Sequence, residues 1–129
     1  MARILVVDDD PVTLRLVQVR LERAGHEVLS FPSPQKALEL VLEGNLPDAV
    51  VLDVSMPDIS GLELLQTLRV GFGLKALPAV FLSARAKPED IAAGQALGAT
   101  YLTKPFVATA LLKAIDQVLK SPGIPKISS

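Results

Sequence analysis

A chain of 129 residues is long enough to form one domain with a sizeable core, because a globular chain of this length hides about two thirds of its unfolded surface. Half of the residues are apolar, yet no apolar stretch approaches the roughly 20 residues that a membrane-spanning helix needs. With 13 basic against 14 acidic residues and no basic run, the sequence also lacks the charge pattern of a protein that binds nucleic acid directly.

The first elements alternate strand and helix. Ile4–Val7 is an apolar run of strand length. Asp10 and Pro11 then predict the start of a helix, because Asp is a good N-cap and a proline in the first turn loses no helical hydrogen bond. This helix is expected to end at Gly25, and Val28–Phe31 is the second predicted strand.

The same signals recur in the middle of the chain. Pro34 opens a second predicted helix, which Gly44 closes, and Ala49–Leu52 is the third apolar run of strand length. A third helix is expected to begin at Ser60, because Ser60 and Glu63 fit a capping box, in which each side chain binds the backbone N–H of the other residue.

The last elements continue the alternation. Ala79–Leu82 is the fourth predicted strand, Pro88 opens the fourth helix, Tyr101–Thr103 is the fifth strand, and a fifth helix covers about residues 107–119. The apolar arc of this fifth helix is wider than one sheet-facing stripe requires. Two outcomes are open: part of the arc stays exposed for a partner, or all of it is buried under the sheet.

Near-continuous apolar strands joined by helices predict a parallel sheet that is covered on both faces, with right-handed crossovers. We therefore expect a doubly wound α/β domain of five parallel strands and five helices over residues 1–120. Residues 121–129, "SPGIPKISS", combine turn-forming and small polar residues, which is typical of a flexible tail or linker.

Polar residues follow the ends of four of the predicted strands. Asp8 and Asp9 come after the first strand, Asp53 after the third, Ser83 after the fourth and Lys104 after the fifth. In an open parallel sheet the carboxyl ends of the strands share one rim, where ligands bind. We therefore expect these five side chains to converge.

Clustered carboxylates repel one another and raise one another's pKa unless a cation lies among them. Mg²⁺ suits such a cluster, because it prefers octahedral oxygen ligands and keeps water that a phosphate can displace. Lys104 would then offer a positive charge, and Ser83 a hydroxyl, to phosphoryl oxygens. The group predicts a phosphoryl-transfer site with a carboxylate nucleophile.

The sequence resembles the receiver domains of bacterial two-component response regulators. The acidic pair at Asp8, the stretch "DVSMPDISG" from Asp53, "LSA" around Ser83 and "KPF" from Lys104 stand in the order and spacing of that family. The segment "ALPAVFLSARAKPEDIAAGQALGATYLTKPF" is similar to the single-domain chemotaxis regulators. The resemblance covers about residues 2–120 and implies a flavodoxin-like strand order, 2-1-3-4-5.

The resemblance implies a role for each matching residue at the metal and phosphate site. Asp53 would be phosphorylated, and Asp8, Asp9 and Asp53 would hold Mg²⁺ together with the backbone carbonyl of Ser55. Lys104 would pair with the phosphate.

Further residues would pass the signal on, by the same resemblance. Ser83 would sense the phosphate, and Tyr101 would be the aromatic switch that turns inward in response. The resemblance also implies a cis bond between Lys104 and Pro105. Asp10 has a simpler interpretation as the N-cap of the first helix, with no part in metal binding.

These features predict a phosphorylation-dependent signalling switch of a two-component phosphorelay, which catalyses only its own phosphoryl transfer and dephosphorylation. Its expected partners are a histidine kinase or phosphotransfer protein as the donor, and a downstream protein or output domain as the receiver of the signal. A phosphorylation-dependent dimer is a further option. The sequence "MARILVV" lacks the apolar region and cleavage site of a signal peptide, and there is no cysteine, so we expect a cytoplasmic protein.

Two other functions are compatible with this topology. A flavodoxin-type binding module would need a phosphate cradle after the first strand, where the acids from Asp8 to Asp10 would repel a cofactor phosphate. A phosphatase that works through an aspartyl phosphate usually has a second acid two residues after its nucleophile, where this chain has Ser55.

Overall fold

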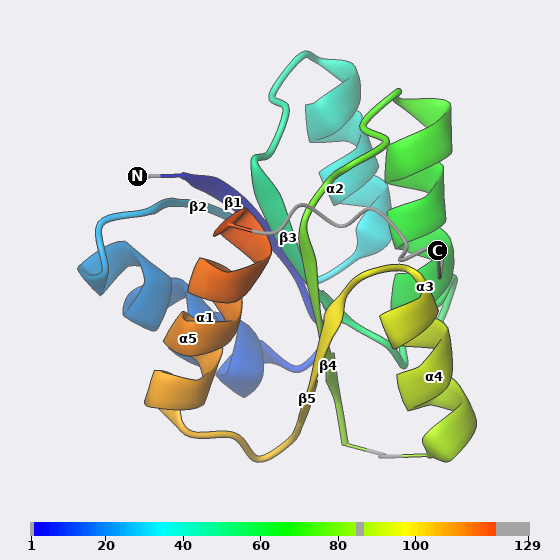
Figure 1. Ribbon diagram of the computed structural model, residues 1–129. Helices are drawn as coiled ribbons and strands as arrows, with labels where there is room; N and C mark the ends of the chain where they lie inside the picture. The colour runs from blue at the N-terminus through cyan, green and yellow to red at the C-terminus, as the bar shows by residue number, and fades with distance from the viewer. Residues whose placement is uncertain (1, 85–86, 121–129) are drawn as a thin grey trace.

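The structure is a computed structural model that describes residues 2–84 and 87–120. Within these ranges, strands and helices alternate along the chain as the sequence predicts (Figure 1). The elements are β1 (Arg3–Val7), α1 (Pro11–Arg23), β2 (Glu27–Phe31), α2 (Pro34–Leu42), β3 (Ala49–Asp53), α3 (Gly61–Gln66), a π-helical turn (Thr67–Gly71), β4 (Ala79–Ser83), α4 (Pro88–Ala96), β5 (Thr100–Thr103) and α5 (Ala108–Lys120). The predicted tail, residues 121–129, lies outside the described residues.

The five strands form one parallel sheet in the order β2-β1-β3-β4-β5, which confirms the predicted fold and strand order. β1 lies between β2 and β3, with Val7 opposite Phe31 on one side and Leu52 on the other. The strand ends at Val7 and Asp53 are therefore neighbours at the centre of the sheet, where the chain order reverses. Ligands of such sheets bind at this position.

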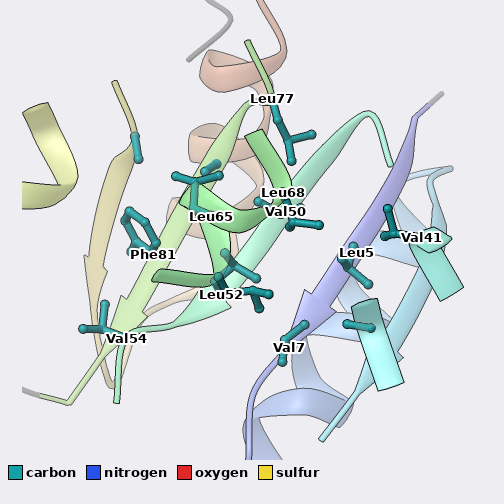
Figure 2. Packing of buried hydrophobic residues seen from close by; sticks show 14 residues of the cluster. Leu5, Val7, Val41, Val50, Leu52, Val54, Leu65, Leu68, Leu77 and Phe81 are labelled. Carbon is teal, nitrogen blue, oxygen red and sulfur yellow. The ribbon is translucent and has the colours of Figure 1, made fainter. Parts of the chain in front are cut away.

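Two apolar cores lie on opposite faces of the sheet, because successive strand residues point to opposite sides. On one face α1 and α5 cover Ile4, Val6, Val51 and Leu82, and these two helices are seen together in Figure 1. On the other face α2 and α3 cover strand residues that include Leu5, Val50 and Phe81 (Figure 2). Every residue of β3 and β4 is buried, as expected for central strands of a parallel sheet.

The helix starts follow the predicted capping signals. The Asp10 side chain accepts a hydrogen bond from the Val12 N–H, at 3.2 Å, at the start of α1. At the start of α3 the Ser60 hydroxyl accepts from the Glu63 N–H at 3.1 Å, and Glu63 accepts from the Ser60 N–H at 3.4 Å. The predicted capping box is thus confirmed, and it fixes where α3 leaves the loop that follows Asp53.

The fifth helix buries most of the apolar arc that the sequence left open. Leu111, Ile115 and Val118 are buried, and Leu112 packs at the edge of the same core. Val107, which precedes the helix, is 66% exposed. Within α5, the structure therefore favours burial under the sheet over an exposed apolar output surface.

No helix within the described part of the chain is both long enough and apolar enough to cross a membrane.

Candidate functional site

The ends of β1, β3 and β5 bring an acidic cluster and a lysine together. Lys104 Nζ lies 2.8 Å from Asp8 Oδ2 and 3.8 Å from Asp53 Oδ1. Each of Asp8, Asp9 and Asp53 offers one carboxylate oxygen, and these atoms lie within 4.8 Å of one another. The predicted convergence therefore holds for these four side chains.

Ser83, the last residue of β4, adjoins this cluster through its backbone. The Lys104 N–H donates to the Ser83 carbonyl at 2.7 Å, which links the ends of β4 and β5. Ser83 is buried. The bond between Lys104 and Pro105 is cis, as predicted.

The three acids differ in their surroundings. Asp8 is completely buried and Asp53 is 4% exposed, whereas Asp9 lies at the surface. Asp8 Oδ1 accepts a hydrogen bond from the Asp10 N–H at 2.8 Å, and its Oδ2 is compensated only by the charge of Lys104 among the described residues. A buried carboxylate oxygen without a hydrogen bond is costly, so this atom is suited to a cation ligand.

Asp53 has a strongly raised pKa. Burial, the negative charge of Asp8 and a side-chain hydrogen bond with Asp9 together raise the pKa of Asp53 from 3.8 to about 7. Lys104 and the Ser55 N–H, which donates to Asp53 Oδ1 at 3.3 Å, act in the opposite direction. A cation among the acids would remove the repulsion and favour the carboxylate form.

This raised pKa makes the stability of the metal-free protein depend on pH. The folded state holds a proton on Asp53 up to about pH 7, whereas the unfolded state releases it near the ordinary value of 3.8. The free energy of unfolding should therefore fall as pH rises from about 4 to above 7, by up to about 4 kcal/mol. Denaturant unfolding in chelator at pH 5 and pH 8 measures the change, with Asp53→Asn as the matched control.

Mg²⁺ should reduce this pH dependence, because it compensates the ionised acids. A stability difference between wild type and Asp53→Asn that is the same at both pH values would contradict the proposed titration of Asp53.

Gly61, at the start of α3, is a site residue that the sequence reasoning did not single out, although it closes the quoted "DVSMPDISG" motif. Its N–H donates to the Val54 carbonyl at 3.1 Å. A Cβ on Gly61 would overlap the carbonyl oxygen of Asp53 and lie 3.0 Å from its carbonyl carbon. Only glycine therefore lets α3 begin directly against the backbone of Asp53.

Replacing Gly61 with alanine should displace the Asp53 backbone and lower the free energy of unfolding by about 1–3 kcal/mol, the usual cost of overpacking. Urea unfolding of the variant measures this loss. Gly71→Ala is the matched control, because a Cβ there would meet only the Thr67 methyl group at 3.8 Å. Equal stability of the two variants would show that the contact with Asp53 imposes no constraint.

Tyr101 lies on β5, half-buried, and its ring centroid is 6.5 Å from that of Phe81 at an interplanar angle of 52°. Gly94 of α4 packs against both rings: a Cβ there would lie 3.1 Å from Phe81 Cδ2 and 3.3 Å from Tyr101 Cδ2. α4 thus packs closely over the predicted switch residue.

Comparison with known proteins identifies the family to which this chain belongs. The model of the response regulator receiver domain matches residues 4–116. The chain belongs to the response regulator receiver domain family. Receiver domains are signalling switches controlled by phosphorylation, so the flavodoxin-type and phosphatase alternatives are not favoured.

Individual proteins of known sequence or structure are also similar to this chain. The sensory/regulatory protein RpfC of Xanthomonas campestris is 40% identical over 122 residues, which are 92% of this chain and 17% of RpfC. The structure of chemotaxis protein CheY4 of Vibrio cholerae is 34% identical, with a TM-score of 0.82 over 92% of this chain and 98% of CheY4. The response regulator TrrA of Thermotoga maritima, in complex with Mg²⁺-BeF, is 31% identical, with a TM-score of 0.77 over 92% of this chain and 99% of TrrA.

Proposed function

We propose that Asp53 of this receiver domain accepts a phosphoryl group from a phosphohistidine donor. The observation that carries the proposal is the position of the Asp53 carboxylate at the end of central strand β3, among two further acids and within 3.8 Å of the Lys104 ammonium. A histidine kinase or a phosphotransfer protein would be the donor. The receiver domain would act only on itself, so we do not regard it as an enzyme for other substrates.

The acids suit Mg²⁺. Asp8, Asp9 and Asp53 would hold the ion, together with the backbone carbonyl of Ser55. The buried Asp8 Oδ2, which accepts no hydrogen bond from the described residues, supports this assignment. Mg²⁺ would neutralise charge on the acids and on the phosphoryl oxygens. The relative TrrA was solved with Mg²⁺-BeF, which supports the choice of metal.

The reaction follows from the charges around Asp53. An oxygen of the Asp53 carboxylate forms a bond to phosphorus while the bond between phosphorus and the donor imidazole nitrogen breaks, and the imidazole takes up a proton. The Lys104 ammonium lies beside Asp8 and Asp53 and can pair with a phosphoryl oxygen there. The product is an acyl phosphate on this chain.

The new phosphate would then favour a different conformation of one face of the domain. Ser83 ends the buried strand β4, and we propose that its hydroxyl binds the phosphate. Tyr101, two residues before the end of β5, would turn inward in response and change the face formed by α4, β5 and α5. A downstream protein, an output domain or a second receiver domain would bind this face in the cytoplasm.

Incubation with a small phosphodonor tests the proposed function. Intact-mass spectrometry should show the addition of one phosphoryl group in the presence of Mg²⁺ and little or none in chelator. A mass that stays unchanged with donor and Mg²⁺, in a protein shown to be folded, would contradict the proposal.

Asp9→Asn should weaken Mg²⁺ binding and slow phosphorylation by about tenfold or more, because one anionic ligand of the ion is lost. The variant should fold normally, since Asp9 is exposed. Calorimetric titration with Mg²⁺ measures the affinity, and Asp58→Asn, at another exposed acid, is the control. If both variants bind Mg²⁺ as wild type does, Asp9 is not a ligand.

A further inference from the structure

A groove lies at the end of the domain opposite the acidic cluster. It runs between the π-helical turn that follows α3 and the C-terminal end of α4, and it has a volume of about 390 Å³. Gln66, Arg69, Val70, Lys75 and Leu97 line it. α3 starts against Asp53 and leads to the loop before β4, so this groove lies near the amino ends of the strands.

Arg69 is the unusual residue of the groove, because it is charged and only 6% exposed. Its Nε and Nη2 groups donate to the Leu77 carbonyl at 3.2 and 2.7 Å, and its Nη1 group donates to the Leu97 carbonyl at 2.6 Å. These bonds use three of the five guanidinium N–H groups. The other two have no acceptor among the described residues.

The positive charge of Arg69 is not balanced by an acid. No carboxylate of the described residues forms an ion pair with it, and burial alone lowers the pKa of its guanidinium. Lys75, exposed on the same groove, adds a second positive charge. No acidic residue lines the groove, so its field favours an anionic group.

The remaining walls of the groove are suited to an apolar side chain. Val70 is 84% exposed, the most exposed of the large hydrophobic residues in the described chain, and Leu97 is half-buried beside it. The exposed amide of Gln66 can bond to a peptide backbone. Residues 121–129 do not match the charge of the groove, because this segment carries Lys126 and no acidic side chain.

We propose that this groove binds an acidic, amphipathic segment of a partner protein. A carboxylate of the segment would pair with Lys75 and with the two remaining N–H groups of Arg69, and an apolar side chain would pack between Val70 and Leu97. This site is separate from the phosphoryl-transfer site, and it adjoins the face formed by α4, β5 and α5 only at Leu97, the residue that follows α4. It does not depend on the proposed chemistry of Asp53.

The probe is a synthetic helical peptide with leucine on one face and glutamate on the other, added to the chain of residues 1–129. Amide NMR shifts should be largest at residues 66–70, 75 and 97. Lys75→Glu should weaken binding about tenfold or more, and Val70→Ser should weaken it as well. Both residues are exposed, so both variants should fold; Lys36→Glu, an equal charge reversal on α2, should leave the affinity unchanged.

Several outcomes would overturn the proposal. The first is the absence of amide shifts at millimolar peptide. The second is a lysine-for-glutamate peptide that binds as tightly as the glutamate peptide does. The third is a loss of affinity in Lys36→Glu as large as that in Lys75→Glu. Shifts of groove amides without peptide would also overturn it if they follow protein concentration, because a second copy would then be the occupant. Shifts caused by replacing Ile124 and Ile127 with serine would identify the chain's own tail instead.

Discussion

Asp53→Asn should abolish phosphorylation by a small phosphodonor, because an amide oxygen is a far weaker nucleophile than a carboxylate and the change removes one anionic ligand of Mg²⁺. The expected loss is at least about a hundredfold in rate, and intact-mass spectrometry at fixed donor and Mg²⁺ measures it. The variant should remain folded, since an amide at this position removes repulsion between Asp53 and Asp8.

Asp10→Asn is the matched control for this experiment. Asp10 lies next to the cluster in sequence but caps α1 through the Val12 N–H, and asparagine is an equally good N-cap. The control should therefore be phosphorylated as wild type is. Undiminished phosphorylation of Asp53→Asn would show that another residue is the acceptor.

Lys104→Met should destabilise the metal-free protein at pH 8 by about 3 kcal/mol, because the change leaves the fully buried Asp8 carboxylate without its cation. The same substitution should slow phosphoryl transfer, since Lys104 is the positive charge beside Asp53. Urea unfolding in chelator measures the stability loss. Lys113→Met, at an exposed lysine of α5, should cost less than about 0.5 kcal/mol.

The loss from Lys104→Met should be smaller in two settings. Saturating Mg²⁺ should reduce it, because the ion replaces part of the missing positive charge. The Asp53→Asn background should also reduce it, because fewer acids then repel one another, and a double-mutant cycle measures this coupling. Equal losses with and without Mg²⁺ and in both backgrounds would show that Lys104 contributes packing rather than charge.

The sequence was sufficient to predict the elements and their order, because their signals are local. Asp10 and Ser60 cap the helices that they were expected to cap, and the apolar runs became the buried strands of one parallel sheet. The strand order also predicted which polar residues meet at the carboxyl ends of the strands. Val7 and Asp53 end neighbouring parallel strands, so Asp8 and Asp9, which follow Val7, must lie close to Asp53.

Other features depend on tertiary contacts that no local pattern encodes. The π-helical turn after α3 buries Arg69 against carbonyls of residues 77 and 97, which are distant in sequence. The difference between buried Asp8 and exposed Asp9 depends on the way the chain turns into α1. The extent to which α5 is buried depends on its packing beside α1 on the same face.

Chemical trapping of the phosphorylated protein tests the central claim most directly. An aspartyl phosphate is an acyl phosphate, so borohydride should reduce it to homoserine, which peptide mass spectrometry locates in the sequence. After treatment with a phosphodonor and Mg²⁺, we expect homoserine at position 53 and unmodified residues at positions 8, 9 and 58. Homoserine at one of those other acids, or a phosphate that resists borohydride and maps to Ser83 or His26, would contradict the assignment of Asp53 as the phosphoryl acceptor.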